Sequence, residues 1–301
     1  MNQISITKEK RAKRIRSYIE RMPSLSTTVT KVLEICNRPD TSANDLNRVI
    51  SLDPVLTGQV LKLINSAYYA FQNKVTSLTR AIIILGLNTV KNLALSTAIL
   101  DTLGKTVSSQ SFTMDDFWTH SIGVGVTAKA LAKEKRVPIE ELEEFFVGGL
   151  LHDLGKIPLT NRFPEDYGQV LERAKHSEEP VYRAENDVFE IDHGMVGEMI
   201  AEKWKLDKGI KDALRYHHQP EEAGGDSRSL VGVVSLANLY INTLELGSSG
   251  EFYPEKERLG DFLEHADIDG AILSELREGI LEKIEEAKIF MQVAQKVAQK
   301  G

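Results

Sequence analysis

The chain has 301 residues, of which 42% are hydrophobic and 27% are charged, and its formal net charge is −7. These values are typical of a globular protein with one large or two modest domains, and they argue against disordered and fibrous classes. The longest apolar run, residues 81–87, is too short to cross a bilayer, and the first residues lack the apolar core of a signal peptide. The sequence therefore predicts a cytoplasmic protein without a membrane partner.

Charge is unevenly distributed along the chain. Residues 1–21 carry a local net charge of +5, which leaves −12 for the remainder. A basic segment of this kind could contact nucleic acid or an acidic partner, although a solvated helix or a frayed terminus is the commoner interpretation. The acidic remainder argues against general affinity for nucleic acid. The single cysteine, Cys36, rules out a disulfide within one chain and a Cys-based zinc site, and its helical spacing predicts a buried structural thiol.

Helix follows helix from residue 22 onward, and no segment shows the alternation of a strand. In the first half we expect helices that open at Pro23-Ser24, at Ser42 with Asp45 in capping-box spacing, at Asp53-Pro54, at Ser77 and at Asn88, with Gly86 ending the fourth of them. This part predicts a compact all-α bundle. The segment 103–113, rich in Gly, Ser and Thr, is the best internal boundary.

The second half predicts a further set of helices and a long amphipathic tail. The expected helices cover residues 114–135, 140–151, 164–176, 180–191, 194–204, 208–218 and 229–246. Gly247–Gly250 is a second loop, and the tail from Asp269 has a helical apolar stripe that could pack on its own body or on a partner. We therefore divide the chain into a basic segment (1–21), an N-terminal helical subdomain (22–112), a metal-binding helical subdomain (113–246) and a C-terminal loop and helix (247–301).

The most informative stretch is residues 148–158, which contains His152-Asp153 at the end of an apolar helical run, followed by Gly155-Lys156. An adjacent His and Asp offer a metal ion two ligands, and the Lys stands near enough to balance an anion. A His-Asp pair alone is common by chance, so its significance depends on the histidines around it.

Further His and carboxylate residues occupy helix faces and helix ends in the C-terminal half of the chain or just before it. Asp116 and His120 are four residues apart and share one helix face. His193 and the doublet His217-His218 follow at later helix ends. Each histidine alone is more often a satisfied core or surface residue. Together, their nitrogen and oxygen donors suit iron, manganese, zinc or, more weakly, magnesium, and their number exceeds what one zinc ion needs, so two ions fit the pattern.

Three other acidic or imidazole side chains are left out of the ligand set. His176 and His265 lie in charged neighbourhoods and are assigned to the structural class, while for Asp192 a cap on a helix that opens at Gly194 and a metal contact are equally compatible with the sequence.

The ordered pattern His120, His152-Asp153, His193 and His217-His218 resembles the HD superfamily of metal-dependent phosphohydrolases, especially the HD-GYP branch. Residues 22–246 as a whole resemble the related HDOD signalling domain. The marks of the HDOD resemblance are Leu25-Ser26, Ile50-Ser-Leu-Asp53-Pro54-Val-Leu, Leu63-Ile-Asn65-Ser66-Ala67 and Ile83-Ile-Leu-Gly86. The resemblance implies an all-α domain of bacterial regulatory proteins, a domain often thought to have lost catalysis.

The resemblance also implies site residues. Asp116 falls where the HD-GYP family has a carboxylate one turn before the first His, and Lys156 matches the Lys of His-Asp-x-Gly-Lys. The metal ligands implied are Asp116, His120, His152, Asp153, His193, His217, His218 and Asn238, and the catalytic residues implied are His152, Asp153 and Lys156. Asn238 stands where the family has its last aspartate, and an amide is a weaker ligand than a carboxylate. No Gly-Tyr-Pro follows His218, so hydrolysis of cyclic dinucleotides is not supported.

Two functions stay open from the sequence. The first is a regulatory HDOD module that binds one or two divalent transition-metal ions, with iron favoured, and relays a signal to a protein partner. The second is a metal-dependent phosphohydrolase acting on a nucleotide or other phosphoester. The family resemblance favours the first function, while the completeness of the ligand set favours the second.

Overall fold

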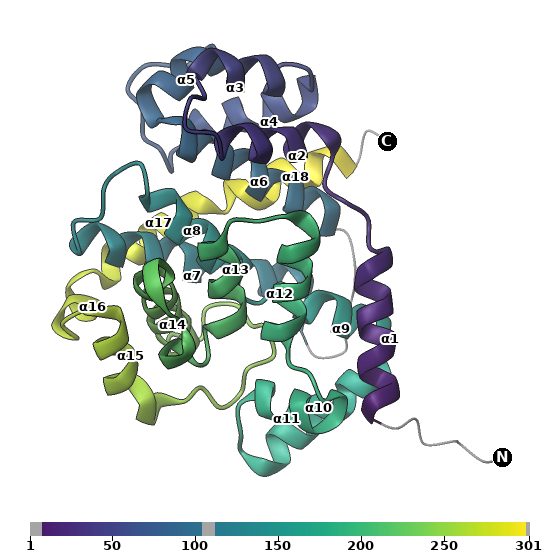
Figure 1. Ribbon diagram of the computed structural model, residues 1–301. Helices are drawn as coiled ribbons and strands as arrows, with labels where there is room; N and C mark the ends of the chain where they lie inside the picture. Colours follow the sequence, from purple (N-terminus) through teal and green to yellow (C-terminus); the bar gives the residue numbers. More distant parts are fainter. Residues whose placement is uncertain (1–7, 104–111, 299–301) are drawn as a thin grey trace.

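The computed structural model describes residues 8–103 and 112–298, and every regular element in these ranges is a helix (Figure 1). The predicted all-α fold is confirmed. Most of the predicted boundary at 103–113 lies outside the described residues. Considered singly, none of the helices in the two ranges is long and apolar enough to cross a bilayer. The helices Leu78–Leu85 and Leu87–Leu103 reach that criterion only as a pair, and they are bent by 119° relative to each other.

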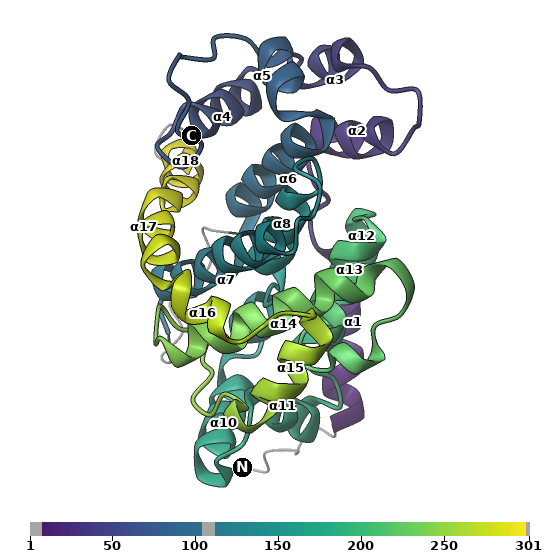
Figure 2. The ribbon, with the colours of Figure 1, turned by 90° about the vertical axis from the view of Figure 1, so that its left-hand side faces the viewer.

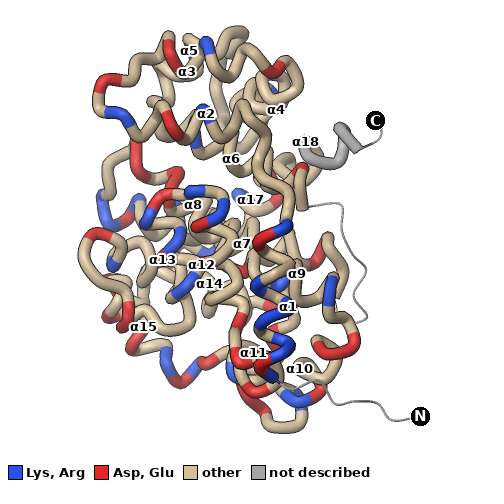
Figure 3. The backbone as a smooth tube through the Cα atoms, turned by 45° about the vertical axis from the view of Figure 1, so that its right-hand side comes forward, with Lys and Arg blue, Asp and Glu red and all other residues tan. Residues whose placement is uncertain are grey.

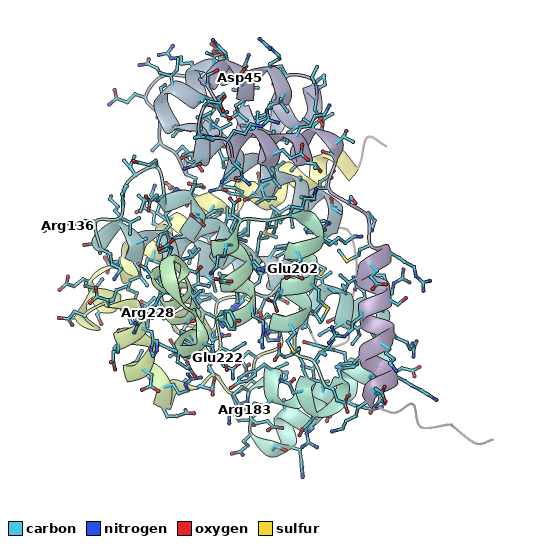
Figure 4. All side chains as sticks on the ribbon, in the orientation of Figure 1. Asp45, Arg136, Arg183, Glu202, Glu222 and Arg228 are labelled. Carbon is cyan, nitrogen blue, oxygen red and sulfur yellow. The ribbon has the colours of Figure 1, made fainter. Side chains whose placement is uncertain are left out.

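Five helices form an N-terminal unit at the top of Figure 1. They are α2 (Thr27–Cys36), α3 (Ala43–Ile50), α4 (Pro54–Ile64), α5 (Leu78–Leu85) and α6 (Leu87–Leu103). The capping chemistry is as predicted: Ser42 forms a reciprocal capping box with Asp45, which is labelled in Figure 4, and the Asp53 carboxylate accepts hydrogen bonds from amides in the first turn of α4.

Two helix starts in this unit differ from prediction. Helix α2 begins after Ser26, whose hydroxyl accepts the Val29 amide, rather than at Pro23-Ser24. Helix α6 begins at Leu87 without a cap at Asn88. The reason is Gly86, whose φ of 87° reverses the chain in a single residue, so that the next helix starts at once. Cys36 is half-buried, and burial raises the pKa of its thiol to about 11, which suits an unreactive cysteine.

The second unit contains the helices that carry the predicted ligands. They are α7 (Met114–Glu134), α8 (Leu142–Leu151), α9 (Lys156–Arg162), α10 (Pro164–Ser177), α11 (Val181–Phe189), α12 (His193–Trp204), α13 (Lys208–Tyr216) and α14 (Arg228–Thr243), with short 3-10 turns at Pro220–Glu222 and Gly225–Ser227. Helix α9 was not predicted, because Gly155 and Pro158 suggest a loop. Pro158 is accommodated because it lies in the first turn of α9, where no backbone N–H donor is needed. Helices α7 and α8 approach so closely that a Cβ on Gly149 would lie 2.7 Å from the Cα of Gly125.

The basic N-terminal segment is a packed helix from Lys8 on. Helix α1 (Lys8–Arg21) buries Ala12, Ile15 and Ile19 against α9, α11 and α12, while most of its Lys and Arg residues, which Figure 3 marks along the helix, are exposed. Its Arg11 pairs with Asp166 of α10 at 2.8 Å. The expectation of a helix with a solvated basic face holds for the described residues, but the helix also docks on the body through an apolar stripe of three residues, which was not predicted.

The C-terminal tail wraps around the body and returns to the N-terminal unit (Figure 2). Its elements are the 3-10 turn Lys256–Arg258, α15 (Leu259–Ala266), α16 (Ala271–Glu275), α17 (Arg277–Ala287) and α18 (Ile289–Ala298). The single predicted helix is broken at Leu276 and Lys288, because the chain must bend to keep its apolar stripe on a curved surface. Phe290 packs on Phe146 with ring centroids 4.8 Å apart. The tail therefore packs on its own body.

A buried polar cluster joins the N-terminal unit to α7 and α8. The Lys129 ammonium pairs with Glu143 and lies 5.0 Å from the ring centroid of Tyr68. The Tyr69 hydroxyl donates to Glu143 at 2.8 Å. Burial alone lowers the pKa of Lys129, but the Glu143 carboxylate outweighs it and raises that pKa.

We expect Glu143→Ala to lower the free energy of unfolding by about 2 kcal/mol, because it leaves the Lys129 charge and the Tyr69 hydroxyl without their partner. This expected loss of stability is smaller than for a fully buried ion pair, since the Lys129 side chain is 23% exposed. Urea unfolding measures the change. The control is Glu141→Ala, an exposed residue two positions away, which should change stability by less than about 0.5 kcal/mol. Equal stability of the two variants would contradict this account of the cluster.

Candidate metal centre

Six predicted ligands from four segments meet in one buried region. His120 lies in the middle of α7, His152 and Asp153 follow the last turn of α8, His193 opens α12, and His217 and His218 follow α13. All except the partly buried His218 are fully buried. The close approach of α7 and α8 at their glycines sets His120 beside His152, with ring centroids 5.4 Å apart.

Their ligand atoms form two groups that share the Asp153 carboxylate. In each group the ligand atoms lie within 4.8 Å of one another; one contains Asp153, His193, His217 and His218, and the other contains His120, His152 and Asp153. Asp153 Oδ1 lies 3.1 Å from His193 Nε2 and 3.7 Å from His217 Nε2. Its Oδ2 lies 3.3 Å from His152 Nε2 and 3.8 Å from His120 Nε2. The carboxylate thus presents one oxygen to each group, as a ligand that bridges two cations would.

In three of the histidines Nδ1, the ring nitrogen that faces away from the cluster, lies within hydrogen-bond distance of an acceptor. Nδ1 of His152 lies 2.6 Å from the Gly149 carbonyl oxygen, and Nδ1 of His217 lies 3.0 Å from that of Leu214. Nδ1 of His193 lies 2.6 Å from Glu185 Oε2. A proton on each Nδ1 leaves the Nε2 lone pair facing the cluster, which is the arrangement typical of histidine metal ligands.

The buried polar atoms of this region fit a divalent cation. His152 Nε2 and Asp153 Oδ1 are buried and have no hydrogen-bond partner among the described residues. His193 Nε2 lies 3.1 Å from Nε2 of both His217 and His218. Lone pairs that converge at this distance repel one another, so these contacts need either a shared proton, as in a hydrogen bond between the rings, or a cation between the nitrogen atoms. The donor set, imidazole nitrogen with carboxylate oxygen, is one that iron, manganese and zinc accept.

The protonation states of His120, His217, His218 and Asp153 favour ligation, whereas His193 must first lose a proton. Burial lowers the pKa of His120 to about 3, and burial together with neighbouring imidazoles holds the pKa values of His217 and His218 well below their usual range, so these rings are neutral at pH 7. Burial alone raises the pKa of Asp153, but Lys156 and His152 outweigh it and hold that pKa well below its usual range. Burial alone also lowers the pKa of His193, yet Glu185 and Asp153 raise it to about 9.

Glu185 is a functional candidate that the sequence analysis missed. Its side chain is fully buried, and Oε2 accepts hydrogen bonds from both Nδ1 and the backbone amide of His193, the latter at 2.7 Å. Its Oε1 accepts the Tyr167 hydroxyl at 2.9 Å. One signal could have revealed it: Val181, Glu185 and Phe189 are four residues apart, so an acid lies within the apolar stripe of α11.

The structure does not bring Asp116 to the metal centre, which corrects the predicted ligand set. The Asp116 carboxylate accepts the Thr113 hydroxyl at 2.7 Å, and the two residues form a capping box at the start of α7. Asn238 does reach the second group, because its Oδ1 lies 3.1 Å from His120 Nε2. Asp192 caps α12 by accepting the Met195 amide at 2.8 Å.

Lys156 is buried beside the shared carboxylate. Its Nζ donates to Asp153 Oδ2 at 3.0 Å and to Ser249 Oγ at 3.1 Å. Both interactions hold the ammonium inside the protein. The predicted role of Lys156 in balancing charge is consistent with the first contact, while the second links it to the loop described next.

A loop of residues 245–255, here called the covering loop, closes the outer side of the centre. Its Ser248 amide donates to the Asp116 carbonyl at 3.1 Å, and Glu251 accepts the Val181 amide at 3.1 Å. Arg183, labelled in Figure 4, pairs with Glu255 at 2.7 Å. The cavity left between this loop and His217, His218 and Asn238 measures about 20 Å³. That space holds about one water molecule.

Gly155 is required by the close packing of α9 on α12. A Cβ at this position would lie 1.9 Å from the His193 carbonyl oxygen, so α9 or the first ligand of α12 must shift. We expect Gly155→Ala to destabilise the fold by at least about 2 kcal/mol in thermal or urea unfolding. The matched control is Gly168→Ala in α10, which meets nothing within 4 Å and should stabilise the protein by up to about 1 kcal/mol. Two variants with the same effect would contradict this packing.

The helical fold and the His-Asp centre are those of an HD-type domain. The chain belongs to the HDOD family, because the HDOD domain profile matches residues 22–220, which is more than half of its length. An uncharacterized protein of Treponema pallidum (strain Nichols) is 25% identical over 236 residues, which make up 78% of this chain and 45% of that protein. The chain thus spans less than half the length of this relative.

Solved structures share the fold over nearly the whole chain. An HDOD domain protein of unknown function from Geobacter sulfurreducens is 25% identical, with a TM-score of 0.76 over 94% of this chain and 98% of that one. A Shewanella amazonensis SB2B protein provisionally named a phosphohydrolase is 22% identical, with a TM-score of 0.69 over 93% and 97%. A Marinobacter aquaeolei VT8 protein provisionally named for signal transduction is 19% identical, with a TM-score of 0.72 over 97% and 68%. At these identities the last two show the fold alone.

Proposed function

We propose that the chain is an HDOD regulatory module in which a buried HD-type centre holds one or two divalent transition-metal ions without turning over a substrate. The observation that carries this proposal is the 20 Å³ cavity beside the ligands. Ligand sites for small molecules usually measure about 300–1,000 Å³, so a nucleotide has no room there. A protein partner and a cytoplasmic location belong to the same proposal.

The contacts of Lys156 give independent support. In a phosphohydrolase the ammonium would have to face a phosphate group. Here it faces Asp153 and the covering-loop Ser249, and only 1% of its surface is exposed. The side chain therefore stabilises the closed arrangement of α9 and the loop.

The ligands come from four segments of the chain, so a bound cation would hold the helices that carry them in a fixed arrangement. Asp153, the four histidines of α8, α12 and α13, and His120 of α7 would hold the cation, and Glu185 would keep His193 in the ligating tautomer. A bound divalent cation would supply cross-linking of these segments and, where a phosphate could reach it, Lewis-acid polarisation. Iron is the favoured ion, with manganese, zinc or magnesium as alternatives.

A turnover screen tests the proposal. We expect no hydrolysis of cyclic dinucleotides, mononucleotides or a generic phosphodiester by the protein loaded with manganese or iron. We also expect chelation to lower the thermal midpoint by several degrees and addition of the metal to restore it, because affinity of the folded state for metal becomes folding free energy. Hydrolysis that His152→Ala abolishes would overturn the regulatory proposal.

A second candidate is a metal-dependent phosphohydrolase, favoured by the shared Asp153 carboxylate between two ligand groups. That function requires the covering loop to open. Replacing Glu251 and Glu255 by Ala removes the contacts of the loop to Val181 and Arg183. Phosphodiester hydrolysis that appears only in this variant would support the second candidate. Absence of hydrolysis in this variant would support the regulatory module instead.

A further inference from the structure

A second, larger pocket lies between α1 and α9. It measures about 510 Å³, and we call it the arginine pocket. It is lined by Arg14, Ser17, Tyr18, Arg21, Met22, Pro23, Arg162 and Phe163. Figure 3 shows the Lys and Arg positions of α1 alongside α9. Its size falls within the range of sites for small ligands.

The pocket carries three positive charges without a matching acid. None of its lining residues is acidic, and no carboxylate of residues 8–103 or 112–298 pairs with Arg14, Arg21 or Arg162. Two other cations of the same helix are paired, Arg11 with Asp166 and Lys13 with Glu9, whereas the exposed Lys10 and Arg16 make no ion pair with a described residue. The pocket is set apart because it gathers three unpaired guanidinium groups around one space with no acid in its lining.

Aromatic rings hold two of the guanidinium groups in place. The Arg162 guanidinium carbon lies 4.7 Å from the Tyr18 ring centroid, and that of Arg14 lies 5.1 Å from the Phe163 ring centroid. Stacking uses the face of a guanidinium and leaves its in-plane N–H donors available. Arg21 is fixed in another way, because its Nη2 donates to Ser17 Oγ at 2.7 Å. These contacts restrict the three exposed side chains before any ligand arrives, which lowers the entropic cost of binding.

We propose that the arginine pocket binds a small molecule that carries two or more phosphate groups, such as a nucleoside polyphosphate. Guanidinium groups bind phosphate oxygens through paired, charge-assisted hydrogen bonds. Three guanidinium groups match the charge of a ligand with several phosphates better than they match that of a ligand with one carboxylate. The site lies apart from the metal centre and does not rest on the proposed function. Helix α9 connects the two, with Lys156 at one end and Arg162 at the other, about 9 Å apart along the helix axis.

Calorimetric titration of the full chain with pyrophosphate and with adenosine triphosphate, at constant ionic strength, tests the proposal. We expect both probes to bind, and the double variant Arg14→Gln, Arg162→Gln to lower the affinity about tenfold or more. The matched control is Arg16→Gln with Arg38→Gln, which removes the same charge from exposed residues outside the pocket and should change the affinity less than about twofold. Equal thermal midpoints show that both double variants fold.

Three outcomes would overturn the proposal. The first is no binding of either probe to the unmodified protein. The second is undiminished binding by the pocket variant, which would place the phosphates at the metal centre. The third is an equal loss of affinity for the probes in the pocket variant and in the control variant. A single-stranded oligonucleotide that binds more tightly than either probe, and whose affinity both variants lower equally, would have the same meaning, since each result would indicate a diffuse basic surface.

Discussion

Asp153→Asn is expected to reduce bound metal to less than about a tenth of an equivalent, while the unmodified protein retains about one or more. Asp153 is the one side chain common to both ligand groups, with Oδ1 directed to His193 and His217 and Oδ2 to His152 and His120. The amide keeps the shape of the side chain but removes its charge and replaces one oxygen by an NH₂ group, which cannot ligate a cation. Metal analysis after gel filtration measures the result.

Asp116→Ala is the control for this experiment. Asp116 was implied as a ligand by family resemblance, but its carboxylate lies in the capping box with Thr113. We therefore expect the Asp116 variant to keep its full metal content and to lose only about 0.5–1 kcal/mol of stability. Loss of metal from the Asp116 variant, or retention by the Asp153 variant, would contradict the assignment of these two carboxylates.

Glu185→Gln is expected to weaken metal affinity by about 10–100-fold, although Glu185 is not itself a ligand. The carboxylate accepts Nδ1 and the amide of His193, which fixes the ring and directs Nε2 toward Asp153. A Gln side chain can present its NH₂ group to the same nitrogen and then favours the opposite tautomer. Competition with a chelator of known affinity measures the change.

The control for Glu185 is Asp187→Asn on the same helix. Asp187 is 46% exposed and pairs with Arg173 on the surface, so its loss should leave metal affinity within about twofold. A Glu185 variant with unchanged affinity and the same thermal midpoint as the control would show that the carboxylate does not position His193.

The helices were predictable where local chemistry determines them. The capping box of Ser42 and Asp45, the cap at Asp53 and the stop at Gly86 each act within a few residues, so the sequence carries their full signal. Helix α9 and the breaks in the tail were not predictable in this way. They depend on packing against distant surfaces, such as the contact of Gly155 with α12.

The candidate site was predictable in its histidines and less so in its acids. A buried imidazole at a helix end has few roles other than metal ligation. A carboxylate, in contrast, can cap a helix, form an ion pair or ligate a metal. Thr113 lies three residues before Asp116, and this capping-box spacing is a local signal that the ligand assignment of Asp116 did not take into account. Glu185 and the covering loop reach the centre only through tertiary contacts, with Ser249 separated by 93 residues from Lys156. Periodicity alone does not report such contacts.

The central claim is that the converging imidazoles and the Asp153 carboxylate hold a transition-metal ion. Elemental analysis of the untagged protein, purified without added metal or chelator, tests it most directly. We expect about one or two equivalents of a transition metal, with iron favoured. Less than about a tenth of an equivalent of any metal, in protein that also takes up none from solution, would contradict the claim.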